Sequence, residues 1–90
     1  MKIYKLEKTM YKHGAYEDEF GDKVDGYSEY FLKEEDAISK FNEIFARKKE
    51  FHENLDTYKI IKSKSQGHDY AELWNKNFIT LIYIFEVDVK

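Results

Sequence analysis

The last segment of the chain, Phe78 to Val89 of 90 residues, restricts the fold most strongly. Every second position from Ile79 onward is apolar, which gives a strand one unbroken apolar side, and the opposite side carries Phe78, Ile82 and Ile84. A strand that is apolar on both sides must be covered on both sides, or else it exposes an apolar patch. We therefore expect this strand at the centre of a sheet, with a helix over one of its faces.

That helix is predicted from about Glu34 to Asn54. At 100° per residue, seven apolar residues of this region fall within one arc of about 140°: Ala37, Ile38, Phe41, Ile44, Phe45, Phe51 and Leu55. Lys48 falls in the same arc, so we expect its stem to be buried and its ammonium to reach water. Acidic residues open the helix and basic residues lie toward its end, which complements the helix dipole.

The remaining segments predict a small sheet. Lys2 to Lys12, Tyr27 to Leu32 and Asp56 to Lys64 read as strands. Residues 14–26 read as a loop with turns at two Gly/Asp pairs, within which Ala15 to Phe20 fits either a short strand or loop. Residues 69–74 fit either a helical turn or a strand, and we favour the strand. The expected fold is a single α+β domain over residues 1–90. It has a three- to four-stranded antiparallel sheet, one helix on one face, and the order β-β-α-β-(β)-β.

Composition and motifs argue against several functions. The chain has no Cys, so it lacks disulfides and thiol chemistry. No window reaches the roughly 18 apolar residues of a membrane span, and the N-terminus lacks the apolar core of a signal peptide, so we expect the cytosol. The three histidines are scattered and no catalytic motif is present, so we expect no enzyme activity, no metal site and no cofactor.

The charge is unevenly distributed. Residues 14–36 hold nine carboxylates and two lysines, a net charge of -7 in a chain whose total is -3, and aromatic residues are interspersed. Carboxylates attract a basic partner and aromatics anchor it. We therefore predict a protein partner with a basic surface, bound by Tyr16, Glu17, Asp18, Glu19, Phe20, Asp22, Asp25 and Glu29. The competing interpretation is a solvated loop whose acids stabilise the start of the helix.

Lysines alternate with tyrosines on the first and third strands, and this pattern supports a second hypothesis. Single-stranded nucleic acid would bind through Tyr4, Lys5, Lys8, Tyr58 and Lys59. The negative net charge opposes it, and lysines on edge strands also serve to prevent sheet-to-sheet aggregation. A third hypothesis is a homodimer that buries the second face of the sheet, unless the acidic loop or residues 64–77 fold over that face.

The segment Tyr30 to Ile44, YFLKEEDAISKFNEI, resembles the strand-to-helix segment of many small proteins encoded by phages and other mobile elements. So does the order of an N-terminal strand, one amphipathic helix and a closing hairpin. The resemblance covers about half of the chain and matches no named family residue by residue. It implies an inhibitor that binds a host nuclease, polymerase or defence complex in the host cytoplasm, with anti-CRISPR proteins as one such class, and it transfers no catalytic residue.

Overall fold

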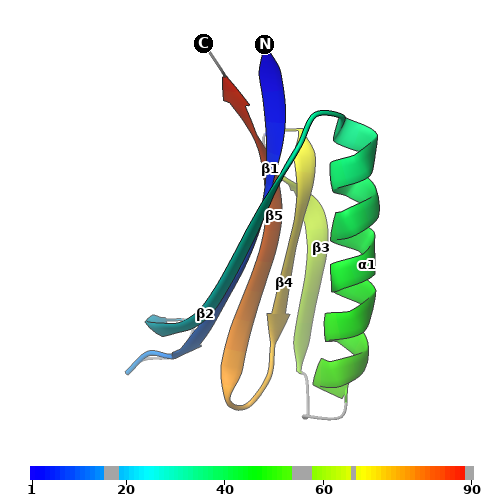
Figure 1. Ribbon diagram of the computed structural model, residues 1–90. Coiled ribbons are helices and arrows are strands. Elements are labelled where there is room, and N and C mark those ends of the chain that lie inside the picture. Colours follow the sequence, from blue (N-terminus) through cyan, green and yellow to red (C-terminus); the bar gives the residue numbers. More distant parts are fainter. Residues whose placement is uncertain (16–18, 54–57, 66, 89–90) are drawn as a thin grey trace.

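The computed structural model describes residues 1–15, 19–53, 58–65 and 67–88. Its elements are β1 (Lys2–His13), β2 (Phe20–Phe31), α1 (Glu34–Glu53), β3 (Lys59–Ser65), β4 (His68–Trp74) and β5 (Phe78–Asp88). The strands form one antiparallel sheet in the order β2-β1-β5-β4-β3, and α1 lies against one face of it (Figure 1). The expected α+β class and element order are confirmed, with five strands in the sheet rather than three or four.

The central position expected for the last strand is confirmed. β5 pairs with β1 along its whole length, from Lys2 opposite Asp88 to Lys12 opposite Phe78, and with β4 on its other side. Because β5 is apolar on both faces, the middle of the sheet is where most of its surface leaves water. The two edges are left to β2 and β3.

The core lies between α1 and the sheet. Its buried residues are Leu6, Ala37, Phe41, Ala71, Leu73, Ile82 and Ile84, and the partly buried residues around it are Tyr4, Phe31, Ile38, Ile44 and Phe45. The predicted apolar arc of the helix is confirmed at Ala37, Ile38, Phe41, Ile44 and Phe45. The side chain of Phe51, and Asn54 and Leu55, lie outside the part of the chain that the structure describes.

The loop predicted over residues 14–26 is the main error. β2 already begins at Phe20, so both Gly/Asp pairs lie within a strand. A Cβ at Gly21 would lie 2.7 Å from the carbonyl oxygen of His13, so glycine permits a close approach of two strands rather than a turn. The paired segments differ in length, residues 4–13 of β1 against residues 20–31 of β2, and register shifts near Tyr11 take up the difference as bulges.

The strand favoured for residues 69–74 is confirmed as β4. Gly67, with φ of 82°, supplies the left-handed residue of the β3–β4 turn. A turn follows Trp74, where the backbone N–H of Asn75 donates a 3.0 Å hydrogen bond to the carbonyl of Phe78. The side-chain oxygen of the fully buried Asn75 accepts hydrogen bonds from the backbone N–H groups of Asn77 at 2.8 Å and Phe78 at 2.6 Å. This side chain holds the β4–β5 hairpin and fixes the register of the central strand.

Candidate functional site

The outer edge of β2 is the longer of the two sheet edges within the described residues. β2 pairs only with β1, so within the described residues a row of its backbone N–H and C=O groups has no strand partner. Most of its side chains are exposed, and apolar ones are among them: Phe20, Val24, Tyr27 and Tyr30 are 40% to 57% exposed. An edge of this kind can accept an additional strand from another chain.

β2 is also acidic, with Asp22, Asp25 and Glu29 against Lys23. The backbone N–H of Gly26 and the ammonium of Lys8, which lies 3.3 Å from Asp25, lower the pKa of the Asp25 carboxyl. Glu29 accepts a hydrogen bond of 2.6 Å from the Tyr27 hydroxyl, and this bond raises the pKa of Tyr27. Both contacts of Asp25 favour the charged form of its carboxyl group.

The structure places five of the eight residues predicted to bind a partner. Phe20, Asp22, Asp25 and Glu29 lie on β2, and Glu19 directly precedes it, where its carbonyl accepts a 2.8 Å hydrogen bond from the Gly14 N–H. Tyr16, Glu17 and Asp18 lie outside the described residues. These five residues share a strand edge rather than one face, because alternate side chains of a strand point to opposite sides.

Phe20 partly covers the sheet face opposite the helix. Its ring lies 5.4 Å from the rings of both Tyr11 and Trp74, measured between centroids. Trp74 and its cross-strand neighbour Ile79 are buried on this face. The ring of Phe20 therefore covers one end of the helix-free face. This is the face that the sequence analysis left open to a partner or a second protomer.

The five residues of the nucleic-acid hypothesis are divided between the two faces. Tyr4 packs against the core on the helix side, and Lys8 follows it there by alternation. Lys5 lies on the other face, over the rings of Tyr30 at 5.4 Å and Phe85 at 5.6 Å. The sequence pattern of alternating lysines and tyrosines therefore does not form one continuous surface.

The remaining two residues of that set lie at the far end of the helix-free face. Lys59 lies over the ring of Trp74 at 4.8 Å, and the exposed Tyr58 stacks on His13 with ring centroids 6.4 Å apart. Both aromatic contacts are made within the chain. A stacking surface for bases at this end would have to compete with them.

Lys8 instead joins a basic groove that the sequence did not predict. A cavity of about 240 Å³ opens between α1 and the β1–β2 pair, and it is lined by Lys8, Tyr27, Lys40, Ile44, Arg47 and Lys48. Burial, and then the positive charge of Lys8, lower the pKa of Lys48. Helical spacing could have grouped the three basic residues of the helix, but only the tertiary packing adds Lys8 and Tyr27.

Two carboxylates are embedded among aromatics on the helix-free face. Glu7 accepts a hydrogen bond from the Tyr83 hydroxyl and lies 2.8 Å from Lys5. Glu72 accepts one from Tyr70 at 2.5 Å and one from the Trp74 indole at 2.7 Å. These bonds satisfy polar groups that lie among apolar neighbours, so this face needs no covering protein for its carboxylates.

No helix within the described residues is both long enough and apolar enough to cross a membrane. Comparisons of the chain with models of known protein families, with curated proteins and with solved structures found no match.

Proposed function

We propose that the chain is a non-enzymatic protein-interaction module that binds a basic partner along the outer edge of β2. One observation carries the proposal: a 12-residue edge strand presents exposed aromatics and carboxylates beside backbone groups that have no strand partner among the described residues. An extended segment of the partner adds to the sheet through main-chain hydrogen bonds, and lysine or arginine side chains meet the acids of β2.

The acidic character of β2 suggests the kind of partner. A protein that handles nucleic acid presents a basic surface, and carboxylates can occupy the positions of phosphates on it. In this proposal the chain is an inhibitor encoded by a mobile element, it acts in the host cytoplasm, and it competes with nucleic acid for a nuclease or CRISPR effector. The resemblance of residues 30–44 to small phage proteins supports this part of the proposal.

The basic groove supports a second candidate function. Four cationic side chains and Tyr27 line one cavity, a combination suited to a phosphate and a stacked base. Glu43 offsets part of this charge, since its carboxylate lies 2.7 Å from Arg47 and 3.6 Å from Lys40. The edge of β2 therefore remains the stronger candidate. A homodimer through the helix-free face is a third, and it would have to bury the carboxylates of Glu7 and Glu72.

A nuclear magnetic resonance titration of the labelled protein separates these candidates. The probe is a short peptide of alternating lysine and valine, which favours an extended conformation and carries the basic charge that the proposal requires. We expect shift changes concentrated in β2 and slower exchange of its outward amides. A peptide of alternating glutamate and valine should produce neither effect.

Charge reversal tests the role of the acids. Asp22→Lys combined with Glu29→Lys should abolish the shifts caused by the basic peptide. The control Glu35→Lys with Asp36→Lys makes the same charge change in the first turn of α1 and should leave them intact. Shifts that survive the β2 changes, or that never involve β2, contradict the proposal. Oligothymidine in the same titration shifts residues of the basic groove only if the second candidate is correct.

A further inference from the structure

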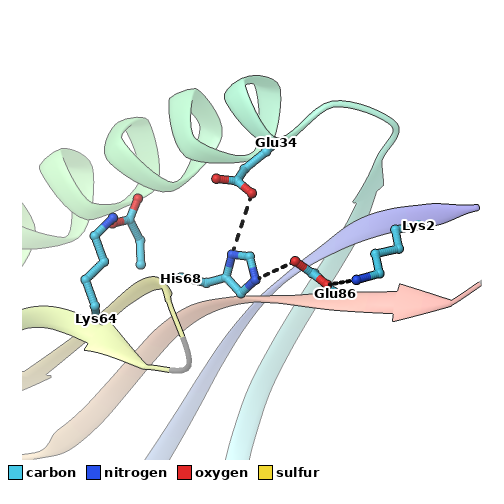
Figure 2. A network of polar contacts seen from close by, with 6 residues as sticks. Lys2, Glu34, Lys64, His68 and Glu86 are labelled. Carbon is cyan, nitrogen blue, oxygen red and sulfur yellow. Dashed lines mark hydrogen bonds and ion pairs between the residues drawn. The ribbon is translucent and has the colours of Figure 1, made fainter.

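Three metal-ligating side chains from different elements meet at the start of the helix. Glu34 is the first residue of α1, His68 is the first residue of β4, and Glu86 lies near the end of β5. Figure 2 shows the imidazole of His68 between the two carboxylates. Its Nε2 lies 3.2 Å from Oε1 of Glu86, and its Nδ1 lies 3.9 Å from Oε2 of Glu34.

The donor set and its spacing match a small transition-metal ion. Each residue offers one ligand atom, and these three atoms lie within 4.8 Å of one another. Ligands at about 2.0–2.2 Å from a tetrahedral zinc ion are about 3.4 Å apart, close to the distance between His68 and Glu86. Oε2 of Glu34 faces the other ring nitrogen, and the Glu34 side chain is 43% exposed, so binding of one ion requires this side chain to turn toward Nε2.

The site is accessible to solvent and its histidine is held in place. A cavity of about 360 Å³ is lined by His68 and Glu86 together with Lys2, Phe85 and Asp88. The His68 side chain is only 13% exposed, and its ring meets that of Tyr4 edge-on, with centroids 6.1 Å apart. A positioned imidazole beside an open cavity is typical of a metal site that retains a water ligand.

We propose that Glu34, His68 and Glu86 bind one divalent transition-metal ion, with Zn²⁺ as the best match to a nitrogen and two carboxylate oxygens. The ion would link the start of α1 to β4 and β5, so its binding would stabilise the folded chain. This site is independent of the β2 edge, and either proposal can fail without the other.

Substitution of Lys2 tests the proposal, because the positive charge of its ammonium disfavours the binding of a metal ion. Its ammonium lies 3.1 Å from Oε2 of Glu86, the carboxylate oxygen that does not face His68 (Figure 2). A cation so close repels a second cation. If the three side chains merely form an ion-pair network, removing Lys2 weakens it. If they bind a metal, removing Lys2 strengthens the binding.

The experiment is calorimetric titration of the chelator-treated full chain with Zn²⁺, repeated with Mg²⁺, together with melting curves with and without Zn²⁺. We expect one Zn²⁺ per chain, a higher Tm with Zn²⁺, and no comparable binding of Mg²⁺, which prefers all-oxygen ligands. His68→Gln, Glu34→Gln and Glu86→Gln should each weaken Zn²⁺ binding about tenfold or more. Lys2→Met should strengthen it severalfold.

Glu35→Gln is the matched control, because it removes a neighbouring exposed carboxylate from the same turn of α1. It should bind Zn²⁺ as the unaltered chain does. Circular dichroism of each variant establishes that it is folded, and Glu34, which is half-buried and lies outside the core, provides a variant that leaves the core untouched. Absence of binding, equal binding by all variants, or equal loss in Glu35→Gln would overturn the proposal.

Discussion

At the scale of single residues, the pair of Glu7 and Tyr83 explains how charge persists on an aromatic face. The nearby ammonium of Lys5, followed by the hydroxyl of Tyr83, lowers the pKa of the Glu7 carboxyl. Burial, followed by the hydrogen bond to Glu7, raises the pKa of Tyr83 to about 12. The folded chain therefore favours a charged Glu7 and a neutral Tyr83.

This pair predicts a specific loss of stability in alkali. An ordinary tyrosine has a pKa of about 10, so between pH 10 and 12 the unfolded chain releases a proton that the folded chain retains. The contribution of Tyr83 is complete below pH 10 and is lost as the pH rises toward 12. Tyr83→Phe should lower the free energy of unfolding by about 1–3 kcal/mol at pH 9 and by less at pH 11.5.

Urea unfolding at the two pH values measures this difference. Leu32→Ala, at an exposed leucine that carries no titratable group, should differ from the unaltered chain by the same small amount at both pH values. If Tyr83→Phe lowers the free energy of unfolding as much at pH 11.5 as at pH 9, the proposed coupling of Tyr83 to Glu7 is contradicted.

At the scale of elements, the helix and the strands it covers depend on one layer of apolar side chains. Leu6 of β1 lies opposite Ile84 of β5. Both side chains belong to the buried core, to which α1 contributes Phe41. The rings of Phe41 and Phe45 lie parallel with centroids 6.3 Å apart. This layer holds α1 on the sheet, and it also positions the basic groove and the Glu34 end of the helix.

Two leucines of different burial test this layer. Leu6 is 0% exposed and Leu32, between β2 and α1, is 73% exposed. Leu6→Ala should destabilise the chain by about 2–5 kcal/mol through lost burial and a cavity. Leu32→Ala should change stability by less than about 0.5 kcal/mol. Thermal or urea unfolding monitored by circular dichroism measures both, and similar effects of the two substitutions would show that the core is not where we place it.

At the scale of the whole molecule, the sheet order separates opposite charges to opposite edges. β2 carries three carboxylates and one lysine, whereas β3 carries Lys59, Lys62 and Lys64 and no carboxylate. Lysines protect the β3 edge from pairing with another sheet, and β2 has only Lys23 for this purpose. The lysines of β3 thus disfavour pairing at that edge of the sheet, whereas the β2 edge is suited to a basic partner.

The same order predicts the pattern of hydrogen exchange. β5 is bonded on both sides and lies under the core, so its amides should open only with global unfolding. The outward-facing amides of β2 should exchange fastest among the strands. Exchange at neutral pH followed by magnetic resonance or mass spectrometry measures this order. Exchange of β5 as rapid as that of β2 would contradict the arrangement of strands.

Periodic segments were predictable because their signal is local. The amphipathic arc around Phe41 and the two apolar sides of the last strand each reflect the environment of consecutive residues, and both identified their elements correctly. Gly21 was misleading, since glycine serves turns and close strand approaches alike and only the His13 backbone opposite distinguishes them. The boundaries of β2 were missed for this reason.

The class of the fold, the helix, the central strand and the acidity of residues 14–36 were predictable from the amino-acid sequence, because periodicity and charge can be read from neighbouring residues. Folding in three dimensions was needed to make β2 an open edge among the described residues, to place Lys8 in a groove with the basic residues of the helix, and to bring His68 to Glu34 and Glu86. These juxtapositions join residues separated by tens of positions. They depend on which strands pair and on which face the helix covers, and no local pattern encodes that.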